Sequence, residues 1–346
     1  MTTSTRIFVP LLVALLLGAP SVGRAKPCLR ACKPAIVACR SACVADGTRP
    51  RRCKKTCRKE AVSSCRAHEG LCFAEVTTTT VVSATTTTTL PPPCGDACPT
   101  GFFPEEHVTS SGVDRTYALY VPPTYDPEQT YALVFAYHGD GGTGADVRAS
   151  LGLEAAANGA AIFVYPDATE ESGRSFTLDT DLAANPDMAM FIDLVAQLSA
   201  RFPVHGVFAT GHSRGGYFAN FLNCTLGASY LDAIAPHSGS GPYGEDDSEY
   251  DVDGHYICPS TPAAALMIHG VDDEVVLISD AEYSRSQWVW GNGCDDSTSA
   301  ITPSPCVEHD GCTEGKPVVW CAVPGLGHDV WDHAAEAIWD FFARFL

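Results

Sequence analysis

The residues best suited to nucleophilic catalysis lie in the run Gly211-His212-Ser213-Arg214-Gly215, which has the form G-x-S-x-G. An apolar, strand-like stretch (207–210) precedes this run, and a helix-like stretch (215–224) follows it. In that context a sharp strand-to-helix turn projects the serine hydroxyl outward, and glycines on either side let the neighbouring segments pack closely. We therefore expect Ser213 to be a nucleophile. The alternative, an ordinary turn serine, does not account for the strand before it and the helix after it.

A serine hydroxyl needs a base, and the base needs an acid to orient it. The run Gly325-Leu326-Gly327-His328 puts a histidine in a glycine-rich loop before the last helix-like stretch, so we expect His328 to be the base. The acid belongs in the run 272–274, which follows the apolar stretch 263–270, and spacing alone leaves its three acidic residues open. The alternative bases lie in strand, turn or surface contexts: His205, His212, His237, His255, His269, His309 and His333.

Attack on a carbonyl creates an oxyanion, which backbone N–H groups must meet. We expect one donor at Arg214, directly after the nucleophile. We expect the other at Asp140, in the loop 138–142 (HGDGG) that follows the apolar stretch 133–137 (LVFAY). A plain glycine turn is the alternative for this loop.

The alternation of apolar stretches along the chain predicts the fold that must position these residues. Strand-like stretches alternate with helix-like stretches, which indicates an α/β fold with a mostly parallel sheet and helices on both faces. The clearest strands are 117–122, 131–139, 161–167, 206–213 and 263–270, and the clearest helices are 188–202 and 334–346. Chemistry in such folds takes place at the carboxyl ends of the strands, where all the candidate residues lie.

The composition is that of a globular protein with a proper core. The chain has 346 residues, 45% of them hydrophobic, and a formal net charge of −19. This balance excludes a polytopic membrane protein and argues against binding to nucleic acid. Sixteen cysteines indicate an oxidising compartment, because disulfides rarely persist in reducing ones.

Residues 1–25 have the pattern of a signal peptide. Arg6 is followed by a short apolar run and by small residues at Gly23 and Ala25, so we expect cleavage near Ala25 and a secreted protein. A membrane anchor is the alternative, but Pro10 and Pro20 interrupt the run well short of the ~20 apolar residues that span a bilayer.

Residues 26–73 are expected to form a small helical hairpin stapled by disulfides. Eight cysteines lie from Cys28 to Cys72, many at the four-residue spacing that places two side chains on one helix face. Zinc is the rival interpretation, but C-x-x-x-C repeats without histidines in an exported chain favour disulfides. Residues 26–72 hold 12 Lys and Arg against 3 Asp and Glu, and such a basic cluster is suited to an anionic surface or polysaccharide.

A threonine- and proline-rich linker (74–93) separates this module from the domain 94–346.

The net charge differs in sign between the N-terminal module and the rest of the chain. Residues 73–346 hold 8 basic against 38 acidic residues, so a cationic module is joined to a very acidic domain.

The domain 94–346 resembles the secreted esterases grouped with poly(3-hydroxybutyrate) depolymerases and feruloyl esterases. The motifs that carry the resemblance are RTYALYVPPTY (115–125), YHGDGG (137–142), ATGHSRGG (209–216), HGVDDEVV (269–276), WGNGC (290–294) and GLGH (325–328). The resemblance implies an α/β-hydrolase fold, selects Asp273 as the acid through the pattern H-G-x-x-D, and implies a disulfide between Cys224 and Cys258. The pairing of the other six cysteines of this domain stays open.

We therefore expect a secreted serine esterase that needs no cofactor or metal and forms an acyl-enzyme at Ser213. The resemblance implies polymer-linked esters: feruloyl or acetyl groups on plant polysaccharide, or a polyhydroxyalkanoate. Trp288, Trp290 and Trp331 are candidates to line the substrate pocket. The alternatives are a catalytically silent hydrolase fold that serves in surface adhesion, and a peptidase on the same fold.

Overall fold

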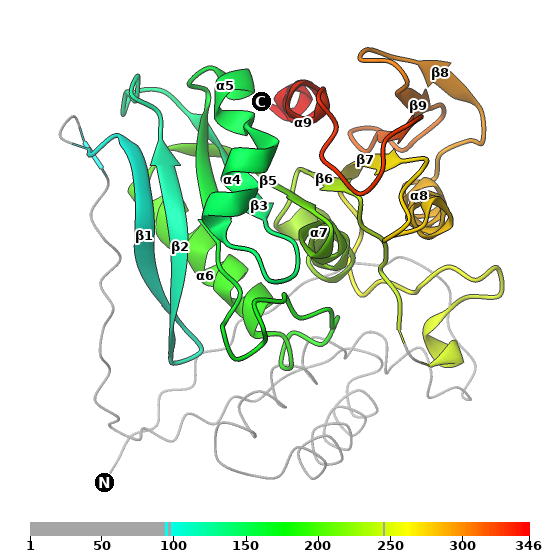
Figure 1. The fold of residues 1–346 in the computed structure, drawn as a ribbon, viewed down its shortest axis with the longest axis horizontal. Helices are drawn as coiled ribbons and strands as arrows, with labels where there is room; N and C mark the ends of the chain where they lie inside the picture. Colours follow the sequence, from blue (N-terminus) through cyan, green and yellow to red (C-terminus); the bar gives the residue numbers. More distant parts are fainter. Residues whose placement is uncertain (1–93, 96–97, 245) are drawn as a thin grey trace, which may run out of the picture. The chain divides into compact units, whose positions relative to one another are not determined.

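The computed structural model describes residues 94–346 except 96, 97 and 245 (Figure 1). The expected signal peptide (1–25), cysteine-rich module (26–73) and linker (74–93) lie outside the described residues, so their boundaries stay predictions.

Ten strands of the described part form one mixed sheet, in the order β1-β2-β4-β3-β5-β6-β7-β10-β9-β8. The strands from β4 to β10 in this order are parallel, and the strands at the two edges are antiparallel. The sheet is mostly parallel, as expected. The strands are β1 (Gly101–Ser110), β2 (Val113–Val121), β3 (Tyr131–Tyr137), β4 (Ala161–Pro166), β5 (Val204–His212), β6 (Ala233–His237), β7 (Ala264–Gly270), β8 (Thr298–Ala300), β9 (Val307–His309) and β10 (Val318–Val323).

Helices cover both faces of the sheet, which confirms the expected layers (Figure 1). One face packs against α6, α7 and α8, and the other against α4, α5 and α9. The helices are α4 (Gly144–Leu151), α5 (Leu153–Ala157), α6 (Pro186–Arg201), α7 (Arg214–Thr225), α8 (Ile278–Gly291) and α9 (Ala334–Phe342), with short 3₁₀ turns η1 (Gly227–Ser229), η2 (Asp247–Glu249) and η3 (Ala343–Phe345).

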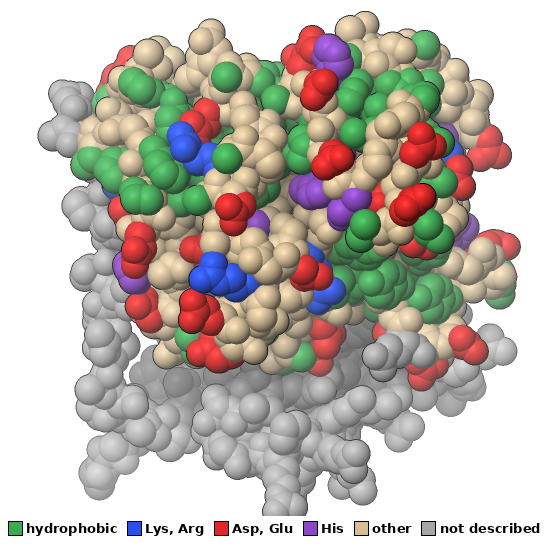
Figure 2. All heavy atoms as spheres, viewed as in Figure 1, with side chains coloured by type: hydrophobic (Ala, Val, Ile, Leu, Met, Phe, Trp, Pro, Cys, Tyr) green, Lys and Arg blue, Asp and Glu red, His purple; other side chains and the backbone are tan. Residues whose placement is uncertain are grey.

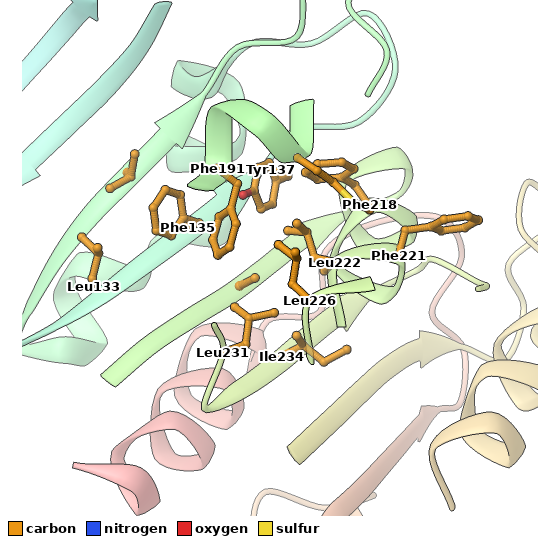
Figure 3. Packing of buried hydrophobic residues seen from close by; sticks show 14 of the residues in the cluster. Leu133, Phe135, Tyr137, Phe191, Phe218, Phe221, Leu222, Leu226, Leu231 and Ile234 are labelled. Carbon is orange, nitrogen blue, oxygen red and sulfur yellow. The ribbon is translucent and has the colours of Figure 1, made fainter. Parts of the chain in front are cut away.

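Strand β3 shows how the two cores are built. All seven of its residues are buried, as expected for a central parallel strand with helices on both sides. Leu133, Phe135 and Tyr137 point to the side of α6 and α7, while Val134 and Ala136 belong to the core on the opposite face. Figure 3 shows the first of these cores, with rings and aliphatic side chains from strands and helices in contact.

Four disulfides join all eight cysteines of the described domain: Cys94–Cys98, Cys224–Cys258, Cys294–Cys312 and Cys306–Cys321. The pair Cys224–Cys258 confirms the one implied by the resemblance. It joins the end of α7 to the segment that leads into β7, so it fixes two parts of the scaffold that carry candidate site residues.

A buried ion pair holds the segment that leads into α6 against the sheet. Arg115 of β2 donates to Asp187 Oδ1 at 2.6 Å, and both side chains are almost completely buried. The second oxygen of Asp187 accepts the Thr177 N–H at 2.8 Å. Because Phe176 precedes Thr177 and its carbonyl accepts a hydrogen bond from Arg214 of the site described below, this pair helps to position Arg214.

Removal of the Arg115 side chain should destabilise the folded protein, because it leaves the buried carboxylate of Asp187 without a cation. We expect Arg115→Ala to lower the free energy of unfolding by about 3–5 kcal/mol in urea denaturation. The control is Arg344→Ala, which breaks a more exposed pair with Glu308 and should cost less than about 1 kcal/mol. Equal costs for the two variants would contradict the structural role of the buried pair.

Candidate active site

Ser213 lies in a sharp turn between the end of β5 and the start of α7. Its backbone has φ 56° and ψ −121°, a conformation that non-glycine residues rarely adopt. The Ser213 N–H donates to the carbonyl oxygen of His237 at 3.0 Å, which ties the turn to β6. The expected strand-turn-helix context is therefore present, with the strained residue at the candidate nucleophile.

Two glycines allow this turn to pack against β3. A Cβ added at Gly211 would lie 2.6 Å from the carbonyl oxygen of Tyr137 and 2.6 Å from the carbonyl carbon of Gly215. A Cβ added at Gly215 would also collide with the Tyr137 carbonyl. No larger residue fits at either position without a shift of the backbone.

His328 joins Ser213 to Asp273 through its two ring nitrogens. Its Nε2 lies 2.9 Å from Ser213 Oγ, and its Nδ1 lies 2.7 Å from Asp273 Oδ2. An ionised carboxylate can only accept, so Nδ1 carries the proton and Nε2 is free to accept the serine hydroxyl proton. The three side chains come from the carboxyl ends of β5, β7 and β10, and residues far apart in sequence therefore meet at one sheet edge.

Asp273 is completely buried, and its carboxylate is well supplied with donors. Its Oδ1 accepts the N–H groups of Val275 and Val276, each at 2.9 Å. Burial alone would raise the pKa of this carboxyl, but the hydrogen bonds from His328, Val276 and Val275 outweigh burial and hold the pKa below its usual range. Asp273 is thus charged at neutral pH and can stabilise a cationic His328.

Three further histidines surround His328. Burial lowers the pKa of His237 and of His269 below the usual histidine value, while burial and the neighbouring His328 lower the pKa of His212 to about 4. These rings are therefore neutral at pH 7. Nε2 of His269 donates to the Val276 carbonyl at 2.8 Å and so supports the loop that binds Asp273. Sequence reasoning treated these histidines only as alternative bases and missed this supporting position.

The loop after β3 lies directly beside Ser213. A Cβ added at Gly139 would be 3.3 Å from Ser213 Cβ. His138 fixes this loop, because its Nδ1 donates to the Gly139 carbonyl at 2.7 Å and its Nε2 accepts the Ala168 N–H at 3.1 Å. His138 is a second supporting residue that the sequence did not single out.

The two expected oxyanion donors are close to this loop. The Arg214 N–H is the first of α7, and such groups have no partner within their own helix. Among the residues the structure describes, the Asp140 N–H donates to none. Side chains hold both residues to one segment, since Asp140 Oδ1 accepts the Ser175 hydroxyl at 2.5 Å and Arg214 Nε donates to the Phe176 carbonyl at 2.7 Å.

None of the three tryptophans expected at the pocket presents an exposed ring beside Ser213. Trp288 is completely buried and donates to Asn220 Oδ1 at 2.8 Å, so it is a core residue. Trp331 is 8% exposed and packs in the core beneath α9. Neither presents a surface to a bound molecule in this structure.

Trp290 is exposed but distant from Ser213. It stacks on His255 with ring centroids 4.7 Å apart, near the end of α8. That end lies at the start of β7, because Asn292 Nδ2 donates to the Ala263 carbonyl at 3.0 Å. The seven-residue strand β7 separates this point from the catalytic edge, a distance of about 20 Å. Helix α8 runs back along β7 and so carries Trp290 away from the catalytic edge, whereas Trp331 lies near that edge, where its N–H donates to His237 Nε2 at 3.0 Å, but has a buried ring.

Comparisons with known proteins agree with this geometry. The chain is 30% identical over 252 residues to "Probable feruloyl esterase C" of Aspergillus terreus, covering 66% of this chain and 83% of that protein. It is 31% identical over 257 residues to "Feruloyl esterase C" of Emericella nidulans, with the same coverage. No protein-family model matches the chain.

A solved structure, "Acetyl xylan esterase from Aspergillus awamori", superimposes with a TM-score of 0.54 at 17% identity, covering 69% of this chain and 99% of that one. Likeness at this identity shows a shared fold. The expected α/β-hydrolase fold is therefore confirmed.

The close packing of the turn can be tested at Gly211. We expect Gly211→Ala to displace the turn against Tyr137 and to lower kcat by at least about 100-fold, because small misplacements of reacting groups are costly. The measurement is hydrolysis of p-nitrophenyl acetate by the folded variant. Gly95→Ala is the matched control, since a Cβ at Gly95 meets nothing within 4 Å. Full activity in Gly211→Ala would contradict this account of the turn.

Proposed function

The chain belongs to the esterase family that includes the feruloyl esterases and is a carboxylic ester hydrolase; from this premise we propose that it cleaves hydroxycinnamoyl or acetyl esters of plant cell-wall polysaccharide. The observation that carries the proposal is the hydrogen-bonded series Ser213–His328–Asp273, with contacts of 2.9 and 2.7 Å. The names of the relatives and of the structural neighbour support feruloyl and acetyl groups as the acyl part.

The proposed reaction begins with attack of Ser213 Oγ on the ester carbonyl. Nε2 of His328 takes the hydroxyl proton, and Asp273 stabilises the imidazolium that forms. The carbonyl oxygen becomes an oxyanion, which the N–H groups of Arg214 and Asp140 meet. The tetrahedral intermediate collapses, the C–O bond to the alcohol breaks, and His328 returns its proton to the leaving oxygen.

Water completes the cycle. His328 removes a proton from the water that attacks the acyl-enzyme, a second tetrahedral intermediate forms, and Ser213 leaves with that proton while the acid is released. The neutral state of His212, His237 and His269 assists both steps, because no second cation competes with His328 for the charge of Asp273.

The alternative of a silent surface-adhesion protein accounts less well for these observations. A binding role does not need a strained Ser213, a base within 2.9 Å of it and a buried acid behind that base. Strained backbone is retained mainly where a site needs it.

We also propose that the enzyme is secreted, with cleavage near Ala25, and that its substrate is polymeric. Four disulfides in the described domain agree with an oxidising compartment. None of the described helices is long and apolar enough to cross a membrane. The basic segment 26–73 would hold the enzyme on an anionic polysaccharide, and a linker would raise the local concentration of catalytic sites there.

A substrate panel tests the proposal. We expect the wild type to release ferulate from methyl ferulate and acetate from acetylated xylan, and we expect Ser213→Ala to lose at least about 10⁵-fold in kcat. A polyhydroxybutyrate film is the comparison polymer. Turnover that persists in Ser213→Ala, or a wild type that cleaves amides but no esters, would refute the proposed reaction.

The salt dependence of turnover tests the proposed attachment through the basic segment 26–73. Salt screens contacts between exposed charges, with a Debye length of about 10 Å at 0.1 M. Turnover on an insoluble anionic xylan should therefore fall as salt is raised, while turnover of soluble methyl ferulate stays constant. Equal responses of the two substrates would rule out electrostatic attachment.

A further inference from the structure

A group of aromatic and apolar side chains lies beside Ser213, outside the hydrogen-bonded series described above. Tyr217 is on the first turn of α7, and its N–H donates to the Ser213 carbonyl at 3.0 Å. The ring of Tyr243, from the loop after β6, meets the Tyr217 ring edge-on, with centroids 6.2 Å apart at 78°. Tyr243 also meets Phe221 at 5.5 Å, so the aromatic group extends from the nucleophile along α7.

Part of this group faces solvent. Tyr243 is 43% exposed, and Val275 and Leu277, on the loop between Asp273 and α8, are 71% and 54% exposed. In Figure 2, hydrophobic side chains gather beside the histidine side chains near the centre of the face in view, over the region between α7, α8 and the loop after β6. Exposed apolar groups that adjoin a reactive centre usually contact a ligand.

The loop that carries Tyr243 is held at several points. Ser240 Oγ donates to the Asp280 carbonyl at 2.7 Å, Ser284 Oγ donates to the Gly241 carbonyl at 2.8 Å, and the Tyr283 hydroxyl donates to the Pro242 carbonyl at 2.9 Å. None of these bonds uses the Tyr243 side chain. The ring is therefore presented by a loop that hydrogen bonds of other side chains hold in place.

Two opposite charges border the tyrosines. Burial raises the pKa of Tyr217 to about 12 and raises that of Tyr243; the negative charge of Asp280 acts in the same direction on both, and the positive charge of Arg214 acts against it. Both phenols are protonated at neutral pH and can donate hydrogen bonds.

We propose that Tyr243 and Tyr217 form the binding wall for an aromatic acyl group of the substrate, and that the exposed Val275 and Leu277 on the loop after Asp273 add further apolar contacts. This inference rests on the proposed function and narrows it, since it assigns the enzyme a preference for hydroxycinnamoyl over acetyl esters. An acetyl group has only a methyl group beyond its carbonyl, so it offers far less surface to this wall than an aromatic ring does. A hydroxylated ring gains contact with the tyrosine faces and hydrogen bonds to groups at their edge.

The test compares methyl ferulate with methyl acetate. These esters share an alcohol without a ring, so the aromatic group occurs only on the acyl side. p-Nitrophenyl esters are unsuitable, because their leaving group could occupy the same wall. For each variant the measured quantity is kcat/KM for methyl ferulate divided by kcat/KM for methyl acetate.

We expect Tyr243→Ala to lower this ratio by about tenfold, the effect of one lost ring contact. Tyr243→Phe keeps the ring and should hold the ratio within about twofold of the wild type. The matched control is Tyr230→Ala. Tyr230 is 38% exposed, but it precedes β6 and so lies at the sheet edge opposite Ser213. Its loss should leave the ratio unchanged.

Several outcomes would overturn the inference. An unchanged ratio in Tyr243→Ala means that the ring does not contact the acyl group, and a parallel loss on both esters means that Tyr243 only supports the loop. A wild type that cleaves methyl acetate but not methyl ferulate contradicts the aromatic wall and leaves the esterase intact. A wild type that cleaves neither ester overturns the proposed function itself.

Discussion

The site depends on one close approach of backbones, where the turn after β5 packs against the end of β3. Gly211 and Gly215 lie so near the Tyr137 carbonyl that a single added carbon would collide with it. This contact sets the height of Ser213 above the sheet and forces its backbone to φ 56°. A tertiary contact must hold such a conformation, because the local chain does not prefer it. The parallel sheet supplies that contact and carries the other site residues to the same edge.

Electrostatics then decides which of the gathered groups is charged. Four histidines lie near one another at this edge, yet only His328 has both a buried carboxylate on one nitrogen and the serine hydroxyl on the other. Burial keeps the remaining three neutral. The hydrogen bonds to Asp273 keep its negative charge available in a place where burial alone would remove it. Proton transfer is thereby directed to one pair of atoms.

Much of this arrangement could be predicted from local sequence. The runs 131–139 and 206–213 are apolar enough to be recognised as central strands, and the glycines around Ser213 and before His328 mark their turns. The strand β6 has only five residues, and the antiparallel edge strands β8 and β9 have three each, so periodicity gave no signal for them. The choice of Asp273 over the acidic residues on either side of it came from the family resemblance, because spacing does not distinguish the three.

The surroundings of the site were harder to predict. Trp290 was a candidate for the pocket, but helix α8 carries it back along β7 to the far edge of the sheet. Tyr243 gave no comparable signal, because its position beside Ser213 depends on how a long loop returns over α7. Local patterns predict strands and turns, whereas the path of a loop is decided by tertiary contacts such as those of Ser240 and Ser284.

The central claim is that one serine is activated by one histidine, and labelling with a fluorophosphonate tests it directly. The reagent phosphylates a serine whose proton is removed by a base, so the label reports activation without the need for a known substrate. Peptide mapping of the wild type should find one adduct, at Ser213, formed in step with the loss of esterase activity, and His328→Ala should not be labelled. Inactivation with the label on another residue, or full labelling of His328→Ala at Ser213, would contradict the account.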